Sequence, residues 1–401
     1  MTLHVFNPEH DIALASGLVN FTAPHAGRQL RHDLGFLPAL WAEPGDSVLV
    51  EDAELAITSL QRLAVAAKKY LGVTVGSEAV LHTGKRQLTG VSVVAPWGWD
   101  AALRGRLRRM GIDDELLPSD EQLSQIRELS HRRVAARLLG NLMQMKELKK
   151  LEELKEATEC RSISEVEEVL ARYPRAVMKA PWSSSGRGLR FVGSQNGSGD
   201  GQSLLTPALE GWVRGVLERQ GSVMVEPYYN KVKDFGMEFE ACADGSIKYC
   251  GLSLFHTANG AYTGNIVATE QWKREAMSRF LRPDVLDEVR ENICHHLADI
   301  LQGRYQGPLG VDMMVVNNNQ YTITNNQYTI NNKQYTITNN QYTINNKQEG
   351  FLLHPCVEIN LRRTMGHVAL ALSPEDDDLV GVMRITYANG CYRLNLGRVE
   401  S

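Results

Sequence analysis

Short apolar runs alternate with amphipathic stretches along the first 115 residues. The apolar runs are 3–6, 47–51 and 91–95, and the amphipathic stretches are 53–70 and 101–110. Runs of four or five apolar residues predict buried strands, and apolar residues at helical spacing predict helices. Because strands and helices alternate, we expect a Rossmann-like α/β domain with a mostly parallel sheet at residues 1–115.

The pattern changes after residue 115, where helices and strands no longer alternate regularly. Helices are predicted at 119–155 (with one break), 162–173 and 283–301, and strands at 223–229, 237–243, 247–255, 310–316 and 352–360. Ser164 is the expected N-cap of the second helix, with Glu167 three residues later. The tail 379–396 fits either a helix or a strand pair that turns at Asn389-Gly390. We expect one larger α+β domain at 116–401.

A low-complexity repeat occupies residues 317–348. Its seven-residue unit carries Gln-Tyr-Thr-Ile after a spacer rich in asparagine. An odd period would turn a straight strand over at each repeat, so four strand residues and three turn residues fit better. The repeat can extend a hairpin tip, form a small meander or be disordered. A neutral expansion of a tolerant loop is favoured over a surface for adhesion or partner contact.

Composition narrows the class of protein. The chain of 401 residues is 43% hydrophobic and 22% charged, which is typical of a soluble globular protein. The formal net charge of −4 disfavours a nucleic-acid partner. No apolar run approaches the roughly 18 residues of a membrane span, and no leader peptide is apparent. Six scattered cysteines without Cys-x-x-Cys indicate a reducing compartment, so we expect a cytoplasmic protein.

A predicted hairpin carries a lysine beside a soft loop. Lys179 ends a short apolar run, the Ser/Gly-rich segment 183–188 follows, and a second apolar run begins at 189. Small residues allow backbone N–H groups to approach phosphate oxygens, and the lysine supplies a point charge. The segment does not match the Walker P-loop. Taken alone, it is equally consistent with a phosphate lid and with an ordinary surface hairpin.

A second constellation lies near the C-terminus. Glu358, Asn360 and Arg362 alternate along one predicted strand and therefore share a face. A carboxylate and an amide oxygen suit Mg²⁺, and a guanidinium suits a phosphoryl group or a carboxylate. Upstream, Asp312 is a lone acid in an apolar strand, where a buried carboxylate needs a partner. A metal shared with Glu358 would provide one.

The order in which these motifs follow one another along the chain resembles that of ATP-grasp enzymes. The order is the lysine hairpin, Val-Glu-Pro-Tyr-Tyr at 225–229, Glu238, Asp312 and the strand from Glu358 to Arg362. The hairpin from Lys179 to Arg190 is similar to that of biotin carboxylase-type members. The resemblance covers about residues 130–370. It implies an ATP-grasp domain at 116–401 with a lid subdomain at about 160–228, a preceding pre-ATP-grasp α/β domain, and a repeat inserted in a C-terminal β-hairpin.

The resemblance also implies ATP and Mg²⁺ as cofactors. The implied metal ligands are Asp312, Glu358 and Asn360, and the implied catalytic residues are Arg362 and Lys179. The implied nucleotide-binding residues are Arg132, Lys179, Ser184, Ser185, Gly186, Arg187, Gly188, Glu226, Tyr228, Tyr229, Asp234 and Glu238. His131, Arg132 and Arg133 are alternatives for the first cation, and Arg132 is favoured. Asp234 is an alternative to Glu238 as the acid on the ribose hydroxyls.

By the same resemblance, the expected activity is ligation of a carboxylate to an amine through an acylphosphate. A phosphate-transferring kinase and a non-catalytic nucleotide-binding scaffold remain alternatives. The partners would be small-molecule or peptide carboxylates and amines, and a homodimer is left open. The candidate substrate residues are His256, Asn259, Tyr262, Asn265, His10 and Asp11. The repeat separates Asp312 from Glu358 by 46 residues; without four seven-residue units the separation would be 18, an ordinary hairpin connection.

Overall fold

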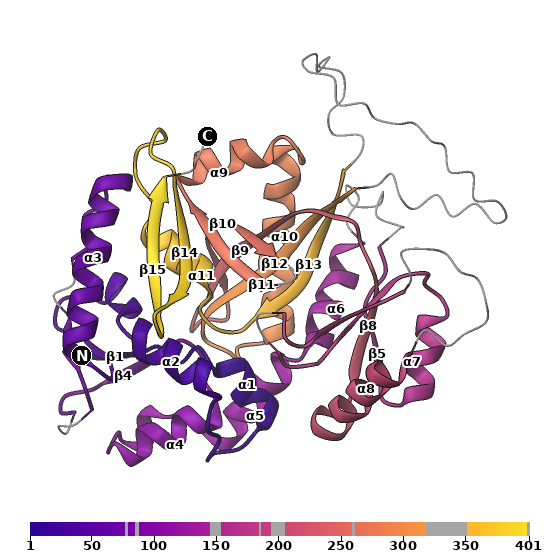
Figure 1. Cartoon of the computed structure of the whole chain (residues 1–401), viewed down its shortest axis with the longest axis horizontal. Helices are drawn as coiled ribbons and strands as arrows, with labels where there is room; N and C mark the ends of the chain where they lie inside the picture. The colour runs from indigo at the N-terminus through magenta and orange to yellow at the C-terminus, as the bar shows by residue number, and fades with distance from the viewer. Residues whose placement is uncertain are drawn as a thin grey trace.

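The computed structural model describes a protein built on three β-sheets (Figure 1). The described residues are 1–76, 79–84, 88–144, 154–183, 186–193, 205–258, 261–317 and 351–398. Ser184, Ser185, Asn259 and the repeat after Asn317 lie outside them, so the predictions made for those residues are not taken further.

The N-terminal layer is a four-stranded parallel sheet in the order β3-β2-β1-β4, as the alternation of strands and helices predicts. Its elements are β1 (Thr2–Val5), α1 (His10–Ser16), α2 (His25–Leu34), β2 (Ser47–Leu49), α3 (Ala53–Leu71), β3 (Val80–His82), β4 (Val93–Pro96) and α4 (Ala101–Arg109). Short 3-10 turns lie at Leu37–Leu40 and Asp114–Leu116. Asp52 caps α3 by accepting from the backbone N–H of Leu55, and the helix ends at Gly72, whose φ is 67°.

A small antiparallel sheet contains the lysine hairpin. Its order is β5-β8-β6-β7, with two helices packed against it. The elements are β5 (Thr158–Cys160), α7 (Ile163–Leu170), β6 (Ala176–Lys179), β7 (Leu189–Val192), α8 (Pro207–Gln220) and β8 (Val223–Pro227). The N-cap of α7 is Ser162, which accepts from the N–H of Glu165; the expectation of Ser164 was wrong, because Ser164 is already within the helix.

The third sheet has seven strands in the order β13-β12-β9-β10-β11-β14-β15. Its strands are β9 (Lys231–Ala241), β10 (Ile247–Ala258), β11 (Ala261–Val267), β12 (Gly307–Asn317), β13 (Phe351–Asn360), β14 (Gly381–Ala388) and β15 (Cys391–Arg398). The remaining helices are α5 (Asp120–Leu129), α6 (Arg132–Leu142), α9 (Glu270–Met277), α10 (Pro283–Leu301) and α11 (Met365–Ala371). Helices α6 and α10 share the largest hydrophobic core with this sheet.

In the third sheet, one open alternative of the sequence analysis is decided and two strand boundaries differ from those predicted. The tail is a strand pair, because Asn389 and Gly390 adopt φ values of 53° and 79° and so form the tight turn of a hairpin. Strand β9 begins at Lys231, six residues before the expected start. Strand β10 continues past its expected end at residue 255 as far as Ala258, and Ala261–Val267 pair with it as β11.

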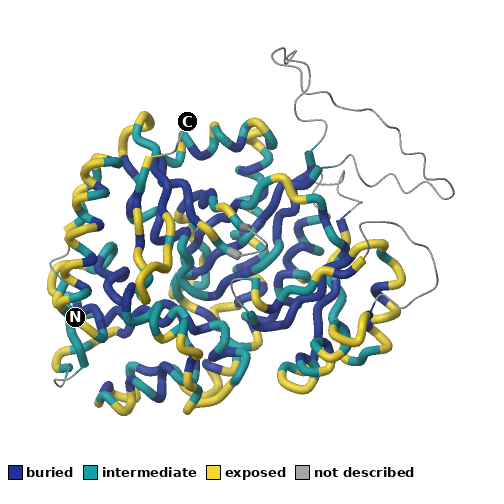
Figure 2. Tube along the Cα trace, viewed as in Figure 1, coloured by how far each residue is buried: buried dark blue, intermediate teal, exposed yellow. Residues whose placement is uncertain are grey.

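The C-terminal hairpin packs against the N-terminal layer. Strand β15 lies beside α3 in Figure 1, and it contacts both α2 and α3. One hydrophobic cluster contains Leu63 and Leu71 of α3 together with Met383, Leu394 and Leu396 of β14 and β15. Figure 2 shows buried, intermediate and exposed residues alternating along α3 and β15, so only one face of each element is buried. The first and last segments of the chain therefore share a core.

None of the helices within the described residues combines the length and the apolar character that a bilayer crossing requires.

Candidate active site

Along three neighbouring strands, successive side chains point alternately into the hydrophobic core and toward a polar face. On β9, Phe235, Met237 and Phe239 are buried in the largest core. The residues between them belong to the opposite face, since strand side chains alternate. On that face Asp312 of β12 pairs directly with Glu358 of β13, so their Cβ atoms lie about 5 Å apart. The acids that the sequence places 46 residues apart are cross-strand neighbours.

Two glycines leave room for these acids. Gly236 pairs with Asp312, and a Cβ there would lie 3.3 Å from the Oδ1 atom of Asp312. Gly310 pairs with Glu238, and a Cβ there would lie 2.6 Å from Glu238 Oε2. Any larger residue at 310 would press on that carboxylate. Sequence reasoning missed both glycines, although each stands two residues from an acid on the same strand.

Asp312 is held in an environment that disfavours its charge. Burial, followed by the nearby carboxylates of Glu358 and Glu238, raises the pKa of Asp312 to about 8. Asn360 Nδ2 donates to Asp312 Oδ2 at 3.1 Å. A bound cation would remove the repulsion, and carboxylate and amide oxygens are the ligands that Mg²⁺ prefers. Asp312 and Glu358 could therefore hold a magnesium ion, and Asn360 would join them after a turn of its amide, whose nitrogen here faces Asp312.

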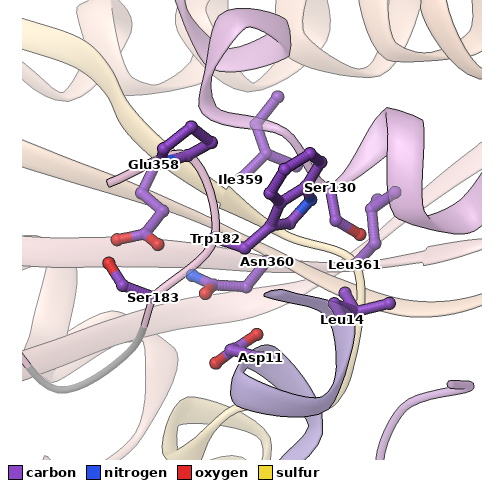
Figure 3. A pocket seen from close by; sticks show the side chains of 10 residues that line it. Asp11, Leu14, Ser130, Trp182, Ser183, Glu358, Ile359, Asn360 and Leu361 are labelled. Carbon is purple, nitrogen blue, oxygen red and sulfur yellow. The ribbon is translucent and has the colours of Figure 1, made fainter. Parts of the chain in front are cut away.

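Arg132 joins these acids to the lysine hairpin. It is the first residue of α6, and its Nη2 lies 2.8 Å from Glu358 Oε1. The same guanidinium donates to Ala180 O at 3.0 Å and to Ser183 O and Oγ at 3.3 Å. Figure 3 shows Ser183 and Glu358 pointing toward one another, with Asn360 beside them. Among the three alternatives for the first cation, Arg132 is the one that reaches the acids, whereas Arg133 pairs with Glu128 and Glu159.

Lys179 is buried on the hairpin strand β6. Its Nζ lies 2.5 Å from Glu226 Oε1 of β8, and both side chains are mostly buried. Burial and the nearby charge of Lys179 lower the pKa of His354 on β13 to about 3, so the lysine also lies close to the strand of Glu358. Gly188 closes the hairpin tightly, because a Cβ there would collide with Ser183. Gly186 adopts φ 71°, and Arg187 beside it is part of the same turn.

Arg362 follows β13 and reaches the N-terminal layer. Its Nε and Nη2 donate to the Asp11 carboxylate of α1 at 3.0 and 2.8 Å, and Nη2 also donates to Asn360 Oδ1 at 2.9 Å. Burial, the largest single cause, would raise the pKa of Asp11, but the charge and hydrogen bonds of Arg362 together with the charges of His10 and Arg132 lower it. The structure thus brings Asp11, a candidate substrate residue, directly onto Arg362.

A cavity of about 10 Å³ lies between these groups, lined by Asp11, Ser183, Glu358 and Asn360 (Figure 3). Its walls come from α1, the hairpin and β13. Three of the segments that the sequence singles out therefore meet at this cavity, which is large enough for about one water molecule.

The residues expected at the adenine and ribose lie in two different surroundings. Tyr228 stacks under Arg175, whereas Tyr229 is buried and its hydroxyl bonds the backbone of Lys155. Asp234 lies within hydrogen-bonding distance of Lys231 and Thr257. Glu238 is only 3% exposed and lies 3.1 Å from His367 Nδ1. Asp234 is thus the more accessible of the two candidates for a ribose, and Glu238 belongs with the acids around Asp312.

The remaining candidate substrate residues are mostly held by other side chains. Tyr262 donates to Asn265 Oδ1, and Asn265 donates to Ser253 Oγ at 2.9 Å. His10 is 1% exposed and lies 3.4 Å from Asp100 Oδ2. His256 is exposed on β10, and partial desolvation followed by nearby Lys233 and Arg384 lowers its pKa. Of this set, Asp11 alone lines the small cavity.

We expect the protein to lose stability in acid because of His131, whose pKa is low in the folded state. It caps α6 by accepting from the Arg133 N–H at 3.0 Å, and burial followed by Arg133 lowers its pKa to about 4. Between pH 6.5 and 4 this histidine binds a proton in the unfolded chain but not in the folded one. The free energy of unfolding therefore falls as pH falls. His131→Asn keeps a cap, and it should reduce the loss of unfolding free energy between pH 7 and 4.5 by about 2 kcal/mol. Denaturant unfolding at the two pH values measures this; equal losses in both proteins would contradict it.

Comparisons with known proteins were made at the level of families, curated sequences and structures. No family model and no curated protein matches the chain. Solved structures match it in fold. N5-carboxyaminoimidazole synthetase from Staphylococcus aureus, complexed with ADP, is 12% identical with a TM-score of 0.45, over 96% of this chain and 82% of that one.

Two biotin carboxylase structures also match. The enzyme from Campylobacter jejuni, in complex with a nucleotide, is 10% identical with a TM-score of 0.45, over 96% of this chain and 75% of that one. The biotin carboxylase domain of Hydrogenobacter thermophilus 2-oxoglutarate carboxylase, with MgADP and bicarbonate, is 11% identical with a TM-score of 0.43, over 74% and 58%. Similarities at this level assign no activity to the present chain.

Proposed function

We propose that this chain is an ATP-grasp ligase that uses Mg-ATP to activate a substrate carboxylate for attack by an amine. The observation that carries the proposal is the contact made by Arg132, which lies 2.8 Å from Glu358 Oε1 and 3.3 Å from Ser183. The contact joins the acids suited to Mg²⁺ to the hairpin suited to phosphate, although the two come from separate sheets.

Each side chain has a task that its position supports. When bound, Mg²⁺ would neutralise charge between the carboxylates and the nucleotide phosphates. Asp312, Glu358 and Asn360 would hold it, and Lys179 would lie against phosphate oxygens. Arg362 would orient the acyl group or the transferred phosphoryl group, because its guanidinium is already fixed by Asp11 and Asn360. The hairpin from Lys179 to Leu189 would cover the site and exclude water from the activated acyl group.

The test is a screen for ADP release from Mg-ATP against amino acids, peptides and small acids, singly and in pairs. A ligase releases ADP at an increased rate only when a carboxylate and an amine are both present, because the amine consumes the activated acid. Mass spectrometry of the products should show a new amide and free phosphate.

Two outcomes would overturn the proposal. A stable phosphorylated product that forms without an amine would identify a kinase instead. Failure to bind Mg-ATP, by calorimetry on the full chain, would exclude the ligase, the kinase and the nucleotide-binding scaffold alike.

A further inference from the structure

A second and larger cavity lies on the opposite side of α1 from the small one. Its volume is about 200 Å³. Helix α1 separates the two, because Asp11 and Leu14 line the small cavity while Glu9 and Ala13 line the large one. None of the residues proposed to bind ATP or Mg²⁺ lines the large cavity, so it needs its own explanation.

The cavity lies at the carboxyl ends of two parallel strands. The segment after β1 contributes Asn7 and Glu9, and the segment after β4 contributes Asp100. Strand β1 has β2 on one side and β4 on the other, so the chain returns to opposite sides of it. Ligands of open α/β sheets bind at such a switch point.

Two acids line this cavity, but neither presents its charge to the free space. Asp100 is 2% exposed, and its two oxygens accept from the Leu103 N–H at 2.8 Å and from Asn7 Nδ2 at 3.1 Å. One oxygen of Glu9 contacts Arg31, and the other is fully buried. An anion that entered the cavity would therefore meet no exposed carboxylate of either residue.

Four arginines from two helices line the same cavity, and they are not all neutralised. Arg31 contacts Glu9 and donates to Glu51 Oε1 at 2.7 Å. Its three neighbours have no acid within hydrogen-bonding distance among the described residues, and they are Arg28 of α2 and Arg106 and Arg109 of α4. The cavity therefore presents more positive than negative charge.

Arg106 is the arginine whose charge is least favourably placed. Its guanidinium lies 3.8 Å from Glu51, too far for a hydrogen bond. Burial, followed by the charge of Arg31, lowers the pKa of Arg106. A bound anion would offset this cost, because an opposite charge stabilises the charged form of a partly buried group.

The number of available guanidinium groups favours a phosphate group over a carboxylate. One arginine satisfies a carboxylate through two parallel hydrogen bonds, whereas a phosphate has three strong acceptor oxygens and can bind several arginines. Arg28 donates to the backbone oxygen of Ala23 at 3.1 Å, which leaves most of its five N–H groups for a ligand. Phe21 and Leu103 add apolar surface for a carbon group attached to the phosphate.

We propose that this cavity binds a phosphate group through Arg28, Arg106 and Arg109. The group is either a free phosphate ion or the head of a small phosphate monoester, since both present the same oxygens. The site is separate from the proposed nucleotide site and does not depend on the proposed ligase activity.

The experiment is calorimetric titration of the full chain with glycerol 3-phosphate, inorganic phosphate and malonate, at an ionic strength of about 0.15 M. At least one phosphate compound should bind about tenfold or more tightly than malonate, which offers two carboxylates instead. Tighter binding of glycerol 3-phosphate than of inorganic phosphate identifies a monoester site, and equal binding identifies a site for the free ion.

Arg106→Met and Arg28→Met should each weaken phosphate binding by about tenfold or more. Both variants should fold, because neither removes the hydrogen-bonded partner of a buried acid; denaturant unfolding checks this. Arg108→Met is the matched control, because Arg108 lies on the same helix as Arg106, is exposed and pairs with Asp114. It should bind phosphate as the unmodified chain does.

Four results would overturn the phosphate site. They are no binding of either phosphate compound up to about 10 mM, binding of malonate as tight as that of phosphate, equal losses in Arg106→Met and Arg108→Met, or unchanged binding in both Arg106→Met and Arg28→Met. The last result would place the phosphate elsewhere, for example in the nucleotide site.

Glu358→Gln separates this site from the proposed nucleotide chemistry. It should remove most of the effect of Mg²⁺ on ATP binding and leave the Arg106-dependent binding of phosphate unchanged, because Glu358 lines the small cavity and not the large one. Either proposal can therefore fail without the other.

Discussion

Glu358→Gln should remove most of the gain in ATP affinity that Mg²⁺ provides, by a factor of about 10²–10³. The variant keeps the shape of the side chain but loses a charged ligand opposite Asp312. An amide oxygen is a weaker ligand for Mg²⁺ than a carboxylate oxygen. The variant also leaves one negative charge, on Asp312, where Asp312 and Glu358 together would present two to the metal. Calorimetric titration with ATP, with and without Mg²⁺, measures the effect.

Glu128→Gln is the control for this variant. Glu128 is an exposed acid that pairs with Arg133, the neighbour of Arg132, so it tests a general loss of negative charge near the start of α6. It should leave Mg-ATP binding unchanged. If Glu358→Gln binds Mg-ATP as tightly as the unmodified chain, the assignment of Asp312, Glu358 and Asn360 to a metal is wrong.

Lys179→Met should abolish ATP binding and also destabilise the fold by about 3–5 kcal/mol. The stability loss arises because Glu226, whose carboxylate lies 2.5 Å from Lys179 Nζ, would be left charged in a mostly buried position. Adding Glu226→Gln removes that buried charge. The double variant should therefore recover most of the free energy of unfolding while ATP binding stays lost.

Denaturant unfolding and ATP titration on the same three proteins separate the two effects of Lys179. Arg172→Met is the comparison for stability, since Arg172 and Glu168 form an exposed pair, and it should cost less than about 1 kcal/mol. A double variant that regains ATP binding would show that Lys179 has only a structural role. A single variant as stable as the parent would show that the buried pair is not energetically coupled.

Local patterns predicted the parts of the fold that depend on neighbouring residues in the chain. The helix Pro283–Leu301 was predicted with its observed bounds, because its apolar spacing begins at a proline in the first turn. The parallel arrangement of the first sheet followed from the alternation of strands and helices, but its strand β3 was not predicted. Placing Glu358 and Asn360 on one face needed only the two-residue period of a strand, whereas Arg362, expected on the same strand, lies beyond the end of β13.

Contacts between distant segments were beyond the sequence. Arg362 and Asp11 are 351 residues apart, and no local pattern links them. The same holds for Arg132 and Glu358, which meet because α6 packs against β13. Ser162 and Ser164 are both good N-cap residues, and only the backbone conformation at Ser162 decides between them.

The shared core of α3 and the C-terminal hairpin constrains the order in which the protein can fold during synthesis. Leu63 and Leu71 emerge from the ribosome long before Met383, Leu394 and Leu396, against which they are finally buried. The N-terminal layer must therefore wait with an apolar helix face uncovered until the last strands are made. Domains usually fold in order from the N-terminus, and uncovered apolar surface favours aggregation. We expect nascent chains that lack β14 and β15 to depend on chaperones, whereas the completed chain does not.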